Sequence, residues 1–131
     1  MTWVAGTDKR CIWFNPAWLA FTGRTLEQEM GDGWTAGIHP ADLERCLRIY
    51  NANFDARTAF SIEYRLLHHS GEYRWIADNG APLYDCAGTF IGYGGSCWDV
   101  TAHHEALKAV EDRKRLLRAI YDTANVAILV S

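Results

Sequence analysis

The sequence predicts an α+β fold, with one five-stranded antiparallel sheet and short helices packed on one of its faces. First, residues 2–15 contain two short runs of aromatic and β-branched side chains, which are typical of strands. Second, residues 15–54 contain helix start and stop residues and apolar side chains at helical spacing. Third, residues 60–100 contain three segments with period-two alternation. Strands, then helices, then strands again place the helices on one side of an antiparallel sheet.

The ends of the early helices are marked by residues with strong positional preferences. Asn15 before Pro16 is typical of a helix start, and Gly23 is typical of the stop that follows. Thr25 with Gln28 three residues later has the form of a capping box, in which each residue satisfies a backbone N–H of the other. We therefore expect two short helices between the second strand and residue 33.

A longer amphipathic helix and three long strands follow. Pro40 fits the first turn of this helix, because a proline there loses no helical hydrogen bond. The apolar side chains at helical spacing are Leu43, Cys46, Leu47, Tyr50 and Phe54. Alternating side chains then predict strands over residues 60–67, 72–84 and 89–100, with tight turns between them.

Composition excludes several classes of function. A net charge of -3 and a pI near 5.9 provide no positive field for nucleic acid. No apolar run approaches the roughly 18 residues that cross a bilayer, so we expect no membrane contact, and no secretory signal follows Met1. The four cysteines have no CxxC spacing, so we expect free thiols and a cytoplasmic location.

Several histidines are candidate metal ligands, and one glycine-rich segment is a candidate phosphate-binding loop. His68–His69 lie at a turn, and neighbouring residues of a strand point to opposite faces, so we interpret them and His103–His104 as structural. His39 precedes a proline at a helix start, which favours a capping role. The GYGG segment at residues 92–95 lies within a strand, where close backbone packing explains it better than phosphate binding. We expect no metal ligands, no catalytic residues and no enzyme activity in this chain.

Four segments together resemble a known family. They are "WFNPAWLAFTGR" after the second strand, "IHPADLE" at the start of the longer helix, "IEYRLLHHSGEYRWI" across a hairpin, and "WDVT" at residues 98–101. Over residues 1–101 the chain resembles PAS domains of the PAS fold-3 type with a C-terminal PAC segment, which occur in bacterial sensory proteins. The resemblance implies the strand order 2-1-5-4-3, a small cavity enclosed by the helices, and a role in sensing or dimerisation.

The resemblance leaves the cofactor unknown. Flavin-binding members of the LOV class carry a cysteine in an Asn-Cys-Arg-Phe-Leu-Gln segment, whereas the corresponding stretch here is "GDGWTAG" at residues 31–37. This difference argues against flavin–thiol photochemistry. Haem-binding members commonly use a histidine on the longer helix, but residues 43–54 contain none, so haem has no support from the sequence.

Two functions from different classes are compatible with these features. As a sensor, the domain would bind a small-molecule ligand in a cavity between the longer helix and the sheet. The candidate ligand-binding residues are Leu43, Cys46, Leu47, Tyr50, Tyr64 and Trp75. As a ligand-free scaffold, the domain would fill this space with the same side chains and would serve only for dimerisation. Both interpretations place Trp75 between the sheet and the helices.

The C-terminal part of the chain predicts a helical linker. We divide the chain into a PAS/PAC sensor domain at residues 1–101, a coiled-coil-like linker at 102–124, and the truncated start of a further domain, resembling a second PAS domain, at 125–131. In the linker, Leu107, Val110 and Leu117 belong to a seam with alternating spacings of four and three, which predicts a homodimer. The alternative is a solvated helix that packs on its own sheet.

The junction between the last strand and the linker is a candidate signal relay. The resemblance implies that this segment fixes the direction in which the helix leaves the sheet. Asp99 can accept hydrogen bonds from Arg65 or Arg74, Thr101 can cap the first helical turn, and Glu63 can hold Arg65 in place. We expect these residues to transmit ligand or partner state to a downstream output domain, of the histidine kinase or cyclic-dinucleotide type, in the same protein.

Overall fold

The computed structural model describes residues 1–130, with side chains described through residue 124. The chain divides into two compact units, residues 1–100 and residues 101–131. The strands of the first unit are β1 (Thr2–Ala5), β2 (Cys11–Phe14), β3 (Phe60–Leu67), β4 (Tyr73–Tyr84) and β5 (Phe90–Asp99). Its helices are α1 (Pro16–Thr22), α2 (Leu26–Glu29), the 3-10 helix η1 (Gly33–Gly37) and α3 (Pro40–Ala56). In the second unit the structure describes one helix, α4 (Thr101–Val130).

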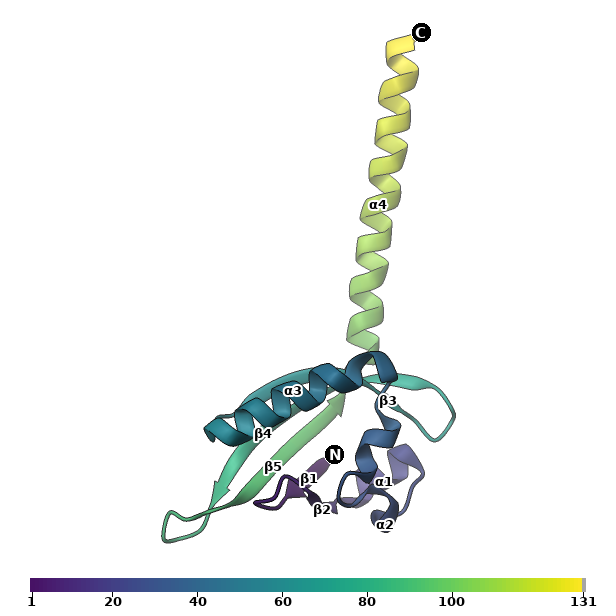
Figure 1. Cartoon of the computed structure of the whole chain (residues 1–131). Helices are drawn as coiled ribbons and strands as arrows, with labels where there is room; N and C mark the ends of the chain where they lie inside the picture. Colours follow the sequence, from purple (N-terminus) through teal and green to yellow (C-terminus); the bar gives the residue numbers. More distant parts are fainter. Residues whose placement is uncertain (131) are drawn as a thin grey trace. The chain divides into compact units, whose positions relative to one another are not determined.

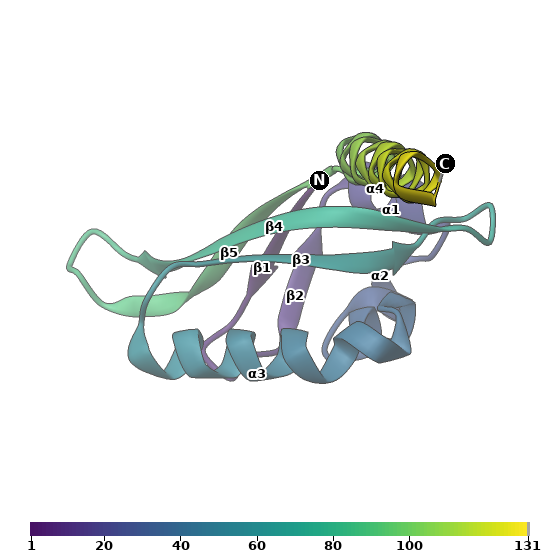
Figure 2. The same ribbon diagram turned by 90° about the horizontal axis from the view of Figure 1, so that it is seen from above.

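The five strands form one antiparallel sheet in the order β2-β1-β5-β4-β3 (Figure 1). Hairpins join β1 to β2, β3 to β4 and β4 to β5, whereas β1 and β5, the first and last strands, pair inside the sheet. Helix α3 runs along one face of this sheet (Figure 2). The strand order and the helices confirm the predicted fold class.

The predicted capping residues set the helix ends through local hydrogen bonds. The Asn15 side chain accepts a hydrogen bond from a backbone N–H of α1 at 3.1 Å, and Gly23 ends that helix with a φ of 69°. Thr25 and Gln28 form the reciprocal bonds of a capping box at 3.2 and 2.9 Å. The ring of His39 accepts a hydrogen bond from the N–H two residues later at 3.0 Å, which confirms its predicted capping role at α3.

Aromatic side chains connect the inner face of the sheet to α3. Tyr93 of β5 is fully buried and stacks on Phe54 of α3, with ring centroids 4.7 Å apart. Its hydroxyl lies 2.8 Å from each of two backbone carbonyl oxygens and shares its one hydrogen between them. Gly95 leaves room for the indole of Trp3, because a Cβ at that position would lie 2.2 Å from the ring. Close packing therefore accounts for the glycine-rich segment of β5, as predicted.

The outer edge of β3 is covered by residues from the start of α3. The buried carboxylate of Asp42 accepts hydrogen bonds from the backbone N–H and from the guanidinium of Arg65, each at 2.9 Å. The backbone N–H of His39 donates to the Arg65 carbonyl at 2.9 Å. Arg45 donates to the carbonyl of Glu63 at 2.7 Å. These contacts occupy backbone groups that an edge strand would otherwise expose.

One segment of the chain reaches both edges of the sheet. At the β2 edge, the backbones of Cys11 and Gly31 exchange two hydrogen bonds, at 3.2 and 2.7 Å. At the β3 edge, Ile38 forms a bridge with Leu66. Residues 31–38, which we call the crossing segment, therefore pass from one edge to the other and carry η1 between them.

Trp75 lies on the outer face of β4. The register of β3 and β4 pairs Tyr64 with Ile76 and Arg65 with Trp75. Tyr64 and Ile76 are buried on the inner face, and successive strand residues alternate between faces. Trp75 is half-buried on the other face, where the Arg65 guanidinium lies 5.2 Å from its ring centroid. The expectation that Trp75 packs between the sheet and the helices is therefore wrong.

Candidate functional site

A cavity lies within the first unit, between the inner face of the sheet, α3 and the crossing segment. Its lining residues are Trp3, Cys11, Phe14, Trp18, Trp34, Cys46, Tyr50, Phe60, Ile62, Tyr64 and Asp78. About 380 Å³ of empty space lies among them, including the part open to solvent, but only about 20 Å³ admits the centre of a water molecule. The smaller volume is the space that a bound molecule can use, and it has room for water. An organic molecule would fit only if side chains move.

Three of the six predicted ligand-binding residues line this cavity. They are Cys46 and Tyr50 of α3 and Tyr64 of β3. Leu43 and Leu47 are half-buried at the side of α3, because the buried stripe of the helix runs through Asp42, Cys46, Tyr50 and Phe54. Trp75, on the outer face, is not among the lining residues. Ligand binding by any of the six stays a prediction.

A buried carboxylate, Asp78, forms the polar part of the cavity wall. Asp78 is 5% exposed and accepts hydrogen bonds from the indole N–H of Trp3 at 2.9 Å and from the Tyr64 hydroxyl at 2.8 Å. Burial raises its pKa above the ordinary value, whereas hydrogen bonds from Trp3, Tyr64 and Cys97 act in the opposite direction. A carboxylate needs such donors in the core, since an isolated buried charge is very costly.

Asp78 is not among the site residues predicted from the sequence, although one indication was present. In β4 the residue alternates in phase with Ile76 and Gly80, which are buried opposite Tyr64 and Phe60 of β3. A polar residue in phase with the core-facing row of a central strand is a candidate for a buried functional group. Recognising it required the register between β3 and β4, which the sequence alone did not supply.

The cavity thiols are held in their protonated form. Burial raises the pKa of the Cys11 thiol to about 12, with a further contribution from the charge of Asp78. Burial likewise raises the pKa of the Cys46 thiol to about 11. The reactive form of cysteine is the thiolate, so at neutral pH both side chains act as small apolar groups with weak S–H donors.

Trp34 presents a hydrogen-bond donor that is not used within the described residues. Its indole Nε1 is buried and has no hydrogen-bond partner. The residue lies in η1 on the crossing segment, and its ring meets Tyr50 edge to face with centroids 6.1 Å apart. A buried unsatisfied N–H costs about 1–3 kcal/mol, so an acceptor bound in the cavity would find a favourable position there.

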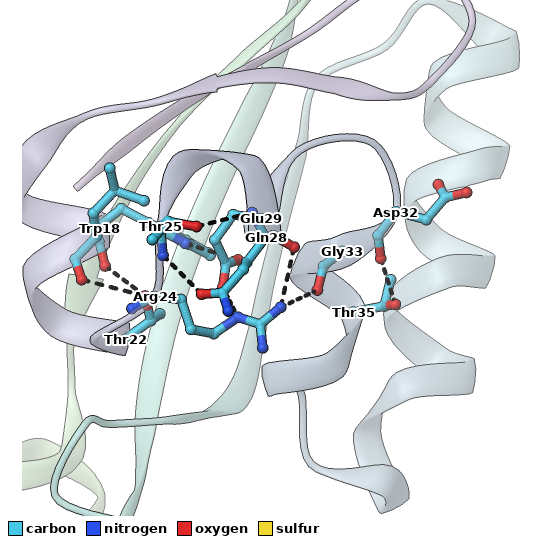
Figure 3. A network of polar contacts seen from close by, with 10 residues as sticks. Trp18, Thr22, Arg24, Thr25, Gln28, Glu29, Asp32, Gly33 and Thr35 are labelled. Atoms are coloured by element: carbon cyan, nitrogen blue, oxygen red, sulfur yellow. Dashed lines mark hydrogen bonds and ion pairs between the residues drawn. The ribbon is translucent and has the colours of Figure 1, made fainter.

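A polar network ties the cavity wall to α2 and η1 (Figure 3). The indole N–H of Trp18 donates to one carboxylate oxygen of Glu29 at 3.2 Å, and Arg24 Nε donates to the other at 2.5 Å. The same guanidinium donates to the backbone carbonyls of Gln28 at 3.0 Å and Gly33 at 3.4 Å. Glu29 is 1% exposed, so both of its oxygens are satisfied away from solvent. Movement of Trp18 would therefore disturb the contacts of Glu29 and Arg24, and through them the backbone at the start of η1.

The end of β5 is fixed to β4 near the point where α4 begins. Of the two arginines predicted as partners of Asp99, Arg74 forms an ion pair with it. The backbone N–H of Val100 donates to the Trp75 carbonyl at 2.8 Å. Helix α4 begins at Thr101 itself. A role of these residues in signalling stays a prediction.

The other relay candidates lie at the β3 edge. Arg65 pairs with Asp42 rather than with Asp99. Glu63 precedes it by two residues on the same strand, and its backbone carbonyl is bound by Arg45. The prediction that the Glu63 side chain holds Arg65 in place stays untested.

The described side chains of α4 include several exposed apolar residues. The predicted seam residues Leu107, Val110 and Leu117 are each more than half exposed, as are Leu116, Ile120 and Tyr121. The helix includes the predicted linker at 102–124 and continues to Val130. The prediction that 125–131 begin a further domain is not tested, and the side chains of these residues lie outside the described part. No helix of the described chain has both the length and the apolar character to cross a membrane.

The cavity offers chemistry for binding. It contains aromatic rings, one carboxylate and one unbonded N–H, and these groups can orient a small molecule. Over residues 1–130, no three His, Cys, Asp or Glu side chains are grouped as a metal ion would require.

Sequence comparison finds relatives that are much longer than this chain. An uncharacterized protein of Sinorhizobium fredii is 35% identical over 117 residues, which cover 89% of this chain and 14% of that protein. A peroxide stress-activated histidine kinase of Schizosaccharomyces pombe is 27% identical over 112 residues, or 79% of this chain and 7% of that protein. The chain thus spans a small part of the relatives it matches.

Solved structures share the fold. A sensory box histidine kinase/response regulator from Burkholderia thailandensis matches with a TM-score of 0.68 and 28% identity, over 90% of this chain and 89% of the other. The N-terminal domain of a diguanylate cyclase with a PAS/PAC sensor from Marinobacter aquaeolei matches in fold, with a TM-score of 0.69 and 22% identity, over 79% and 96%. The family model described as PAS fold matches residues 12–97. This chain, with its five-stranded sheet in the order 2-1-5-4-3, therefore belongs to the PAS fold family.

Proposed function

We propose that this chain is the sensory module of a multidomain signalling protein. The observation that carries the proposal is the cavity, where a buried carboxylate, Asp78, and an unbonded indole N–H, on Trp34, lie among aromatic rings. Polar groups placed in this way select a ligand, whereas a core that only stabilises the fold has no need for them. The similarity to a sensory box histidine kinase and to a peroxide stress-activated histidine kinase supports a kinase as the output domain.

The proposed relay runs along β4 and β5 to α4. Asp78 of β4 lines the cavity and is paired in the sheet with Cys97 of β5. Two residues later β5 ends at Asp99, which Arg74 of β4 holds by an ion pair. A ligand that displaces β4 would therefore move the strand end from which α4 continues. A switch of this kind requires two orientations of the helix within a few kcal/mol of each other, so that ligand occupancy can shift the balance.

Substitution of the junction residues tests the relay. Asp99→Ala and Thr101→Ala in the full-length protein should alter the response of the output domain, or make it independent of the stimulus. Stability of residues 1–131 should change by no more than about 1 kcal/mol for Asp99→Ala, because the Arg74 and Asp99 side chains are each about one-third exposed. The measurements are regulated output activity and urea denaturation.

A matched control uses the second acid near Arg74. Glu72 lies 3.7 Å from the same guanidinium and is 62% exposed. Glu72→Ala removes a neighbouring charge and leaves the Asp99 contact in place, so regulation should be normal. Normal regulation in both Asp99→Ala and Thr101→Ala would reject the relay.

The second candidate function is a ligand-free dimerisation module. The exposed apolar residues of α4 favour it, because an isolated helix that exposes Leu107, Val110 and Leu117 gains stability by pairing with another. The small enclosed volume of the cavity also suits a domain that binds nothing. In both functions we propose that α4 associates two copies of the chain as a parallel pair.

Truncation tests the dimer. Removal of residues 103–131 should convert a dimer into a monomer, as measured by light scattering during size-exclusion chromatography. In the intact chain, Leu117→Lys should weaken association, whereas Asp112→Lys, on the face of the helix opposite the predicted seam, should not. A truncated domain that still dimerises would move the interface to residues 1–102.

The cysteines support a proposal for the cellular compartment. Cys11, Cys46, Cys86 and Cys97 are all free thiols. Unpaired thiols persist in reducing compartments, where disulfides are rare. We therefore propose that this domain works in the cytoplasm.

A further inference from the structure

The cavity wall is built mainly from aromatic rings. Seven of its eleven lining residues are Trp, Tyr or Phe. Tyr50 stands nearly perpendicular to two indoles, with its centroid 6.1 Å from Trp3 at 73° and 6.1 Å from Trp34 at 76°. Phe60 lies almost parallel to Trp3 at 6.2 Å. Rings at right angles form the sides of a box, and the faces of such rings attract cations.

The same box contains a negative group without a basic counterpart. Asp78 lines the cavity and accepts hydrogen bonds from neutral donors, which are Trp3, Tyr64 and Cys97. Among the residues that line the cavity there is no Lys, Arg or His. The described ion pairs of Asp and Glu in the first unit lie elsewhere: at the end of α3, at α2, at the β3 edge and at the β5 end. No lining residue therefore supplies a positive charge to Asp78, and a cationic ligand can supply it.

We propose that the cavity binds a small alkylammonium cation that also carries a hydroxyl or carbonyl oxygen. The rings of Trp3, Tyr50 and Trp34 surround the alkylated nitrogen, and the Asp78 carboxylate offsets its charge. The unbonded Nε1 of Trp34 donates a hydrogen bond to the ligand oxygen. This assignment rests on the proposed sensory function and names the class of ligand for it. Burial raises the pKa of Asp78, and a bound cation would lower this pKa again because it favours the ionised carboxylate.

Entry of the ligand requires the wall to open, and Trp34 is the side chain that can open it. The space of about 20 Å³ that admits the centre of a water molecule is too small for an alkylammonium ion, so side chains of the wall must move for the ligand to enter. Trp34 is half-buried, lies on the crossing segment and makes no hydrogen bond through its indole to any described residue. By contrast, the indoles of Trp3 and Trp18 are held by Asp78 and Glu29. Binding should therefore change the tryptophan fluorescence.

The probes are choline and 3,3-dimethyl-1-butanol, which have the same shape but differ in charge. Isothermal titration of the 131-residue chain should show saturable binding of choline, and binding of the neutral alcohol that is weaker by at least about tenfold. Tetramethylammonium, which has the charge but no oxygen, should bind more weakly than choline. Fluorescence titration with the same three compounds should give the same order of affinity.

Two substitutions separate the contribution of the Asp78 charge to binding from that of the Trp34 N–H. Asp78→Asn should weaken choline binding by at least about tenfold and leave the neutral alcohol unaffected, since it removes charge at constant shape. Asp55→Asn, at an exposed carboxylate of α3, is the control for loss of charge and should bind choline normally. Trp34→Phe keeps a ring but removes the N–H, and disturbs no hydrogen bond of the fold. It should abolish the advantage of choline over tetramethylammonium.

Three results would overturn the assignment. They are equal binding of choline and the neutral alcohol, unchanged choline affinity in folded Asp78→Asn, and no binding of either cation at millimolar concentration. If Asp78→Asn does not fold, the Trp34→Phe comparison decides, and an unchanged preference for choline in that variant overturns the role of Trp34. The sensory function is tested apart from these results by the junction substitutions in the full-length protein, which use the native stimulus.

Discussion

Replacing Trp18 with alanine should lower the free energy of unfolding by about 3–5 kcal/mol, the range for removal of a buried tryptophan. The side chain is 1% exposed, and its ring packs against Phe14 with centroids 4.9 Å apart. The substitution also removes the N–H that donates to Glu29 at 3.2 Å, so a buried carboxylate loses one of its donors. Urea denaturation of the 131-residue chain measures this loss of stability. A loss of this size is a large part of the total stability of an ordinary domain.

Two further variants serve as controls for this result. Trp98→Ala makes the same change on β5, where the side chain is 48% exposed, and should cost about 1 kcal/mol or less. Trp18→Phe keeps an aromatic ring and removes the indole N–H, so it should cost about 1–3 kcal/mol through Glu29. Equal losses for the two alanine variants would contradict the placement of Trp18 in the core.

Acid should remove the stabilisation that Asp42 provides at the edge of β3. Hydrogen bonds from the Arg65 side chain lower the pKa of the Asp42 carboxyl from 3.8 to about 2. Because the folded-state pKa lies below the unfolded value, the unfolded chain binds the proton first. The contribution of Asp42 is therefore complete above about pH 5 and is lost as the pH falls from about 4 towards 2. The shift corresponds to about 2 kcal/mol.

Asp42→Asn isolates this contribution from that of the other carboxylates. The variant should cost about 2 kcal/mol at neutral pH and roughly half as much at pH 3, as measured by urea denaturation at both values. Asp55→Asn, whose side chain is 69% exposed and pairs with Lys9, should cost less than about 1 kcal/mol at either pH. A cost for Asp42→Asn that is the same at both pH values would show that the charge of Asp42 is not responsible.

The ends of the helices could be predicted because the interactions that set them are local. Asn15, Thr25 and His39 each bind a backbone N–H within three residues of their own position. Residue type and spacing therefore contain the necessary information, and no knowledge of the tertiary structure is needed. The alternation of β3 was equally informative, because its buried row, which includes Tyr64, is entirely apolar or aromatic.

The orientation of β4 could not be predicted, because its two rows of side chains give opposite indications. The row with Trp75 and Ala77 is the more apolar, yet the row with Ile76 and Asp78 faces the core. Asp78 is acceptable there only because donors from β1 and β3 reach it. Those donors are 75 and 14 residues away in the chain, so no local pattern reveals them.

The candidate site was predicted in part for a similar reason. Cys46, Tyr50 and Tyr64 lie on elements whose periodicity directs them to the core, and they do line the cavity. Trp34 was missed because η1 is too short to show any periodicity, and its place in the wall depends on the path of residues 31–38 between the two edges of the sheet. Leu43 and Leu47 were included because a helical stripe has a width that sequence spacing does not resolve.

The covered edges of the sheet bear on how neighbouring copies recognise one another. An uncovered strand would accept almost any other strand, since backbone groups are the same in every protein, and fibrous aggregation begins in this way. Here Asp42 and His39 form hydrogen bonds with the backbone of Arg65 at the β3 edge. At the β2 edge, Gly31 forms hydrogen bonds with the backbone of Cys11. At these positions a neighbour can be engaged only through side chains. Side chains differ from one protein to the next, so a cell that contains many related domains can keep their assemblies apart.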